Sequence, residues 1–127
     1  MNKKSCIVRD NNGKVVKKME YNTNGKLALC NIPNTYTTTI YKYNKEGKVS
    51  YTITVNTAKS STYEKWYKYD DNGNLLYIID NNGDKITDTD NTIPTPLDTQ
   101  YDDNGDIVYA RYNDTESFYD YEYFDKE

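Results

Sequence analysis

Apolar and polar residues alternate along much of the chain, which is the pattern of β-strands that present one side-chain set to each face of a sheet. Residues 48–55 show it most clearly, with the apolar members on one face and Lys, Ser and Thr on the other. The apolar members are Val49, Tyr51, Ile53 and Val55. Tyrosines recur at the same two-residue interval, which aligns their rings on one face of a strand. They do so at Tyr41 and Tyr43, at Tyr67 and Tyr69, and at Tyr119, Tyr121 and Tyr123.

Other segments depart from this alternation. Residues 75–79 are apolar on both faces, so we expect this segment to be the most buried strand. Residues 57–65 are predicted to form a short turn or loop. Residues 31–34 and 89–98 lack alternation and contain the three prolines, which predicts loops.

All six glycines occur in one recurring phrase, in which Asp or Asn stands three residues before the glycine. In five of the six phrases an aliphatic residue follows two positions after the glycine, and Lys85 is the exception. The phrase predicts a hairpin turn, because the Asp or Asn side chain caps the turn and glycine adopts the positive φ of a type I turn with a G1 bulge. The predicted turn glycines are Gly13, Gly25, Gly47, Gly73, Gly83 and Gly105.

The glycines also set the length of the repeating unit. Their intervals are 12, 22, 26, 10 and 22 residues, which indicates a unit of about 10 to 12 residues, with a glycine-free turn inside the doubled intervals. Together the patterns predict a single domain over residues 1–127. We expect it to be all-β, an open, twisted antiparallel meander of about eight to ten strands, with no helix longer than about two turns.

Composition narrows the chemistry. The hydrophobic fraction is 35% and 15 residues are Tyr, which predicts a thin, aromatic core rather than a thick aliphatic one. His is absent, so the usual general base near pH 7 and the commonest metal ligand are missing. We therefore expect no catalysis, no metal and no cofactor. The lone Trp66 is predicted to lie in the core, and a sugar-stacking platform with Tyr67 and Tyr69 is the alternative.

The beginning of the chain bears on location. Residues 1–10 contain no apolar stretch of the roughly 7 to 15 residues that a secretory signal needs, and no apolar run of about 18 residues occurs anywhere in the chain. These features predict a cytoplasmic protein without a membrane partner. In that compartment Cys6 and Cys30 are expected to be reduced and partly buried.

Two longer strings, YKYDDNGNLLYIIDNNGDK at residues 67–85 and YDDNGDIVYARY at residues 101–112, resemble the YD repeats of the Rhs family of bacterial proteins. Weaker copies are YNTNGKL and YKYNKEGKV. In that family the repeats form long β-sheet spirals that act as shells or extracellular scaffolds, without catalysis in the repeat itself. The resemblance implies an open, twisted, meandering sheet, with too few repeats here to close a shell. Short standalone relatives are similar to small bacterial or phage accessory and immunity-type proteins.

Charge divides the chain into two halves. Residues 1–69 hold 13 Lys and Arg against 4 Asp and Glu, a net +9, whereas residues 70–127 hold 3 against 16, a net −13. In a meander we expect the two halves to form separate ends of the sheet, which would allow head-to-tail self-association. The basic half contains Arg9 as its single arginine, so direct recognition of nucleic acid is not expected.

These patterns favour a protein that binds another protein, through a tyrosine-rich sheet face or an unpaired edge strand. The alternative is a small phage-type inhibitor of a host defence nuclease, a nucleic-acid-binding protein whose groove the acidic half would fill. Carboxylates on one strand face repeat at about 6.8 Å, which approximates the phosphate spacing of a nucleic-acid strand. The candidate binding residues are Asp114, Glu116, Tyr119, Asp120, Tyr121, Glu122, Tyr123 and Asp125.

Overall fold

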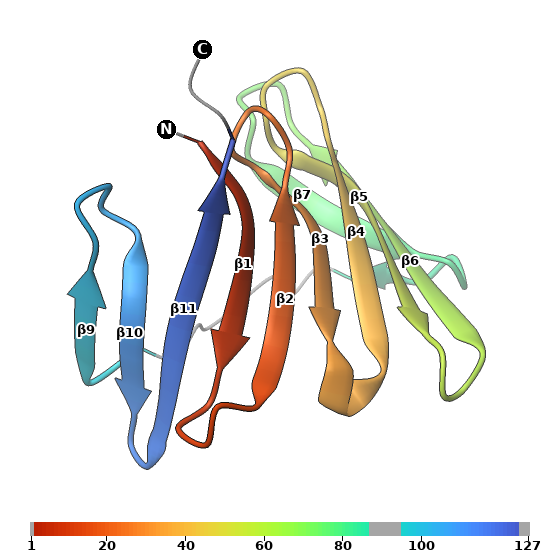
Figure 1. The fold of residues 1–127 in the computed structure, drawn as a ribbon. Helices are drawn as coiled ribbons and strands as arrows, with labels where there is room; N and C mark the ends of the chain where they lie inside the picture. Colours follow the sequence, from red (N-terminus) through yellow and green to blue (C-terminus); the bar gives the residue numbers. More distant parts are fainter. Residues whose placement is uncertain (1, 87–94, 125–127) are drawn as a thin grey trace.

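The chain forms one open antiparallel sheet of eleven strands (Figure 1) in a computed structural model that describes residues 2–86 and 95–124. The strands are β1 (Lys3–Arg9), β2 (Val15–Tyr21), β3 (Leu27–Ile32), β4 (Thr37–Tyr43), β5 (Val49–Asn56), β6 (Ser61–Tyr69), β7 (Leu75–Asp80), β8 (Lys85–Ile86), β9 (Asp98–Tyr101), β10 (Ile107–Tyr112) and β11 (Thr115–Tyr123). Helical structure in the described residues is limited to the 3-10 turn η1 (Pro33–Thr35). The predicted all-β open meander is confirmed.

The strand count exceeds the expected eight to ten because β8 and β9 are short, with two and four residues. The strand order is β8-β7-β6-β5-β4-β3-β2-β1-β11-β10-β9. The first and last strands therefore pair in the interior of the sheet, while β8 and β9, which are consecutive in the chain, form its two opposite edges (Figure 1).

All six glycine phrases form the predicted turns. Each glycine has a φ between 81° and 84°, a region that L side chains adopt at a cost. At Asp70, for example, Oδ1 accepts hydrogen bonds from the N–H groups of Asn72 at 2.9 Å and Asn74 at 2.8 Å. The same pair of bonds closes the other five turns.

Glycine-free turns also occur, as the doubled intervals predict. Tyr36 between β3 and β4 has a φ of 56°, and Ser60 between β5 and β6 has a φ of 52°. The turns at Tyr36 and Ser60 lie on one rim of the sheet. The glycine turns at Gly25, Gly47, Gly73 and Gly105 lie on the opposite rim, which we call the upper rim (Figure 1).

Three loop predictions need correction. Residues 31–34 are the end of β3 and the start of η1, so this segment is a hairpin turn rather than a loop that interrupts the meander. Within residues 57–65, the turn ends at Ser60 and β6 follows. Of residues 89–98, those up to 94 lie outside the described residues, and Asp98 already begins β9.

A β-bulge accompanies the aliphatic residue of the repeat. In five hairpins the register shifts by one residue just after the position two beyond the glycine, as a β-bulge does. In three of them a tyrosine of the next strand donates a hydrogen bond to the carbonyl at that position. The pairs are Tyr43 to Leu27 at 2.5 Å, Tyr69 to Val49 at 2.5 Å and Tyr121 to Ile107 at 2.7 Å.

The Gly83 hairpin lacks this device. Its strand begins with Lys85 instead of an aliphatic residue, and the register stays regular, because Ile79 pairs with Lys85 and Ile78 pairs with Ile86. The exception in sequence is therefore also the exception in structure, which ties the aliphatic position to the bulge.

The sheet has two unlike faces. Residues directly opposite one another in adjacent strands point to the same face, which allows the register to sort every side chain. One face, called the tyrosine face, carries Tyr41, Tyr67 and Tyr121 and also every buried side chain of the described residues. Those are Cys6, Val8, Thr52, Ile78, Asp80 and Ala110. The other face is called the open face.

Two expectations about burial change with this finding. In β5 the register shift places Val49 opposite Tyr43 on the tyrosine face, so only Tyr51, Ile53 and Val55 of the predicted apolar set share the open face. Thr52 of the polar set is the buried residue. In β7 the predicted burial on both faces is wrong, since Leu76 is 52% exposed. Strand β1, which lies between β2 and β11 in the interior of the sheet, is the more enclosed, with Cys6 at 1% and Val8 at 3% exposure.

Candidate binding surface

Strand β11 and its preceding turn contain most of the residues predicted to bind a partner, and the structure divides them between the two faces. Tyr119, Tyr121 and Tyr123 lie on the tyrosine face, where neighbouring rings are 6.5 Å and 6.0 Å apart between centroids. The carboxylates of β11 lie on the open face, Asp114 lies in the turn, and Asp125 lies outside the described residues. The alternation is as predicted, but the eight residues do not form one site.

The open-face carboxylates of β11 are not a continuous row of charges. Phe118 interrupts them, and it is 41% exposed. Glu122 pairs with Lys4 at 3.6 Å, and Glu116 accepts a hydrogen bond from Tyr109 Oη at 2.7 Å. Only Asp120 and Glu122 keep the two-residue spacing on this face, and Glu122 is already paired with Lys4.

The tyrosines of β11 stabilise the sheet. Burial raises the pKa of Tyr121 well above its usual range, and its hydroxyl is bonded to the Ile107 carbonyl. Burial also raises the pKa of Tyr123 to about 12, helped by hydrogen bonds to Asp102 and Asp106. Hydroxyls that are already satisfied inside the protein offer little to a partner.

The charge layout differs from the expected two ends. Strands β7 and β8 lie at one edge of the sheet and β9–β11 at the other, with β1–β6 between them. The acidic half is thus split over both edges and the basic half occupies the centre, because β1 pairs with β11. Head-to-tail self-association stays a prediction. Because both edges of the sheet belong to the acidic half, it cannot occur by contact of a basic edge with an acidic edge.

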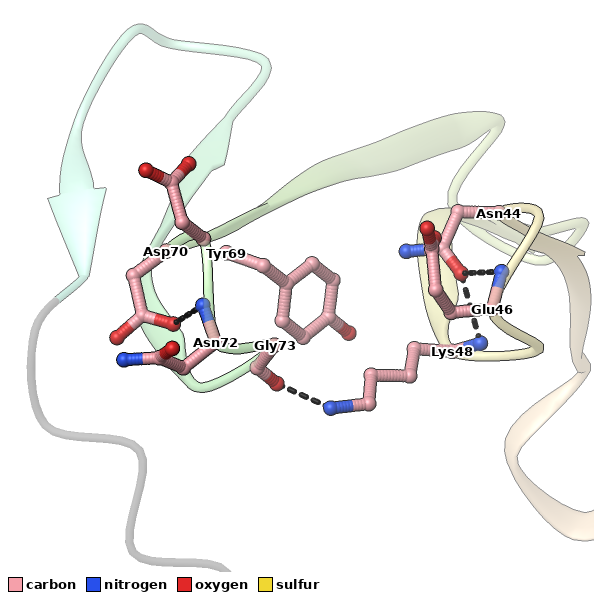
Figure 2. A pocket seen from close by; sticks show the side chains of 8 residues that line it. Asn44, Glu46, Lys48, Tyr69, Asp70, Asn72 and Gly73 are labelled. Carbon is pink, nitrogen blue, oxygen red and sulfur yellow. Dashed lines mark hydrogen bonds between the residues drawn. The ribbon is translucent and has the colours of Figure 1, made fainter.

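A cleft of about 430 Å³ opens on the upper rim between two neighbouring turns (Figure 2). Lys48 crosses it, donating a hydrogen bond to the Gly73 carbonyl and lying 5.7 Å from the centroid of the Tyr69 ring. Asn44 and Asp70 also line the cleft, but their Oδ1 atoms are already bonded within their own turns. These contacts tie the two adjacent turns together, and Glu46, Asp71 and Asn72 complete the lining of the cleft.

Trp66 lies on the open face and is 37% exposed, so the expectation that it belongs to the core is wrong. The sugar-stacking alternative is not assembled either, because Tyr67 and Tyr69 point to the tyrosine face. Trp66 instead packs against Tyr51, with ring centroids 5.4 Å apart and an interplanar angle of 46°.

Apolar side chains surround Trp66 across five adjacent strands. Leu29 lies opposite Ile40, which lies opposite Ile53, and Trp66 lies between Tyr51 and Ile79. We call this set the open-face patch; its members are Leu29, Ile40, Tyr51, Ile53, Trp66 and Ile79. Four strand spacings make it about 19 Å wide, and Ile40 is 36% exposed within it. A contiguous exposed apolar patch on a small domain is typical of an interaction site.

A single carboxylate lies inside this apolar surrounding. Glu64 is opposite Ile53 and two residues from Trp66, and its Oε2 accepts a hydrogen bond from Tyr51 Oη at 2.5 Å. This bond raises the pKa of Tyr51, as expected for a phenol that donates to a charged carboxylate. Lys42 and Lys68 border the patch, but the ion pairs of the described residues are Lys3–Asp106 and Lys4–Glu122.

The sequence contained a signal for the open-face patch. In β7, residues 75–79 are apolar on both faces. We interpreted this as burial, since a strand covered on both faces has the same composition. A single-layer sheet leaves one of the two faces uncovered instead.

The two cysteines are free and lie on the tyrosine face of β1 and β3. Met19 of β2 stands between them, so their Cα atoms are about two strand spacings, or about 9.5 Å, apart, beyond the reach of a disulfide. Burial raises the pKa of Cys6 to about 11, which leaves little thiolate at neutral pH.

Comparison with protein-family models and with curated proteins found no match for the chain. Within residues 2–86 and 95–124, no three His, Cys, Asp or Glu side chains are grouped as metal ligands. No helix in the same residues has the length and apolar character needed to cross a membrane.

Proposed function

We propose that the chain is a non-enzymatic binding module that engages a protein partner through the open-face patch. The observation that carries this proposal is the exposure of Trp66 and Ile40 within a contiguous apolar surface on a sheet that has no second layer over it in the described residues. Aromatic residues concentrate the binding energy of protein interfaces because they contribute large contact areas at low entropic cost.

The other surfaces support a partner less well. On the tyrosine face, hydroxyls such as those of Tyr43 and Tyr69 are bonded to backbone carbonyls of the same sheet. The edge strands β8 and β9 are short, which limits the main-chain hydrogen bonds that a partner strand can make.

Affinity capture from the native host, combined with open-face variants, tests the proposal. We expect the wild-type chain to retain a partner that Trp66→Ala and Ile40→Lys both lose, while circular dichroism and the unfolding midpoint stay close to wild type. Tyr101→Ala is the matched control, because Tyr101 is 62% exposed but lies on edge strand β9. Loss of the partner with Tyr101→Ala and its retention with Trp66→Ala would move the site to the edge.

Light scattering distinguishes a second copy of the chain from a different partner. If the purified protein is a dimer that Ile40→Lys converts to a monomer, the open-face patch is occupied by another copy. Salt separates this outcome from charge-driven association, since contact between oppositely charged surfaces weakens as ionic strength rises.

A second candidate is the nuclease inhibitor with an acidic mimic of nucleic acid. Its support is the composition of residues 95–124, which hold 8 Asp and Glu against 1 Arg, together with the exposure of Asp120 and Glu122 on the open face. The combined variant Asp120→Asn, Glu122→Gln and Asp125→Asn is expected to lose inhibition of a nuclease while keeping its unfolding midpoint. Unchanged inhibition by this variant would exclude mimicry.

A further inference from the structure

The open face contains the same cross-strand cluster twice. In β5 and β6, Tyr51 lies opposite Trp66, and the Tyr51 hydroxyl donates a hydrogen bond to Glu64, which stands two residues before Trp66. In β10 and β11, Tyr109 lies opposite Phe118, and the Tyr109 hydroxyl donates a hydrogen bond to Glu116, which stands two residues before Phe118. The ring centroids are 5.4 Å apart in the first cluster and 5.3 Å apart in the second.

The two clusters differ in the residue opposite the glutamate. Arg111 lies opposite Glu116, whereas Ile53 lies opposite Glu64. The pKa values of the two tyrosines reflect this. In both, the hydrogen bond to the glutamate is the main cause of a raised pKa, but at Tyr109 the charge of Arg111 opposes the rise, and no cation does so at Tyr51.

Glu64 is therefore a carboxylate set among apolar neighbours without a cation of its own. Its Oε2 is bonded to Tyr51 and it takes part in no ion pair of the described residues. Elsewhere in this protein, lysines cover tyrosine rings, as Lys85 does at 4.2 Å from the centroid of Tyr77. Trp66 has no such lysine among the described cation–ring contacts.

We propose that Glu64, with the rings of Trp66 and Tyr51, is a receptor for an arginine side chain supplied by the protein partner. A guanidinium fits this site better than an ammonium, because its plane stacks on an aromatic ring while its N–H groups reach a carboxylate. In the second cluster Arg111 lies opposite Glu116 in the register, but its Nη1 donates to the Asn113 carbonyl and it is not among the ion pairs of the described residues. This inference rests on the proposed function, since it assigns the chemistry of the partner at the open-face patch.

The lone Trp66 reports directly on this site, because it is the single tryptophan of the chain. The probe is a capped peptide of alternating glycine and arginine, and the comparison peptides carry lysine or citrulline in place of arginine. We expect saturable change of Trp66 fluorescence with the arginine peptide. Loss of the charge in citrulline should weaken binding roughly tenfold or more, and lysine should bind more weakly than arginine.

Two variants and a control localise the binding. Glu64→Gln should weaken it roughly tenfold or more, and Ile53→Arg should abolish it, because the new side chain stands where Arg111 stands in the other cluster. Glu116→Gln is the matched control and should leave binding unchanged. Equal binding of the citrulline peptide, no fluorescence change, or equal losses in Glu64→Gln and Glu116→Gln would overturn the proposal.

Partner capture separates this inference from the proposed function. If Trp66→Ala loses the partner but Glu64→Gln and Ile53→Arg retain it, the open-face patch binds the partner without an arginine, and only the receptor is refuted. If Trp66→Ala also retains the partner, the proposed function itself fails. Circular dichroism of each variant ensures that a loss of binding is not a loss of fold.

Discussion

Three tyrosine hydroxyls of the tyrosine face and two of the open face have different acceptors, although Tyr123 of the tyrosine face also donates to carboxylates, those of Asp102 and Asp106. On the tyrosine face, Tyr43, Tyr69 and Tyr121 donate to backbone carbonyls beside bulges, whereas on the open face Tyr51 and Tyr109 donate to glutamates. The first arrangement satisfies neutral groups inside the sheet. The second holds a charged acceptor beside an exposed aromatic ring, which is a surface suited to another molecule. The same residue type thus bonds to backbone carbonyls on one face and to carboxylates beside exposed rings on the other.

The largest effect is expected on the tyrosine face. Tyr121→Ala removes a half-buried ring and its hydrogen bond to Ile107, and should lower the free energy of unfolding by roughly 2 to 4 kcal/mol. Tyr121→Phe, which removes the hydrogen bond alone, should lower it by about 1 kcal/mol. Urea denaturation measures both, and an unchanged midpoint for Tyr121→Ala would remove the structural role assigned to this face.

Alkaline pH should lower the free energy of unfolding through tyrosines of the tyrosine face. The pKa values of Tyr21 and Tyr123 are raised from 10.0 to about 12, chiefly by burial. Since the folded state holds these protons more tightly than the unfolded state, their contribution to stability is complete below about pH 10 and is lost as pH rises through about 12.

The urea midpoint of unfolding should therefore fall between about pH 9 and about pH 12, and denaturation at a series of pH values measures this fall. The double variant Tyr21→Phe and Tyr123→Phe controls for the titration of lysines, and its stability should fall less steeply. A slope as steep as that of the wild type would show that the two phenols do not contribute.

A turn variant changes stability without altering either face. Gly73 has a φ of 84°, which a β-branched residue resists, so Gly73→Val should lower the free energy of unfolding by roughly 1 kcal/mol or more. Gly13→Val is the matched control, because an added Cβ meets nothing within 4 Å at Gly13 but lies 2.6 Å from Lys48 Nζ at Gly73. An unchanged midpoint in both variants would contradict the assigned turn geometry.

The smallest effect on stability is expected on the open face. Trp66→Ala removes an exposed ring and its pairing with Tyr51, and should lower the free energy of unfolding by about 1 kcal/mol or less. Thermal denaturation measures the shift. A loss as large as that of Tyr121→Ala would mean that Trp66 holds the sheet together and that the contrast between the faces is false.

Local features of this fold were predictable from local residues. Each glycine turn is closed by an Asp or Asn three residues earlier, as at Asp70 and Gly73, so its geometry depends on about five consecutive residues. Strand alternation is equally local, which is why the all-β meander was predictable. The strand count was short because β8, with Lys85 and Ile86, has too few residues to show a pattern.

The candidate site was harder to predict. Glu116, Asp120 and Glu122 do share a face, as their spacing indicates, but Lys4 and Tyr109 reach that face from neighbouring strands and engage two of the three. Trp66 was expected in the core because a lone tryptophan usually lies there. Its exposure follows from the absence of a second layer over the open face in the described residues, which no local pattern reveals.

The sequence by itself determined the turns and the strands, because each depends on backbone preferences and side-chain hydrogen bonds within a few residues. Tertiary structure alone decided that β1 pairs with β11, which places the acidic residues at both edges of the sheet. It also decided which face is buried and set Ile53 rather than an arginine opposite Glu64. These outcomes depend on contacts between residues far apart in the chain, which are chosen by the packing of the whole sheet.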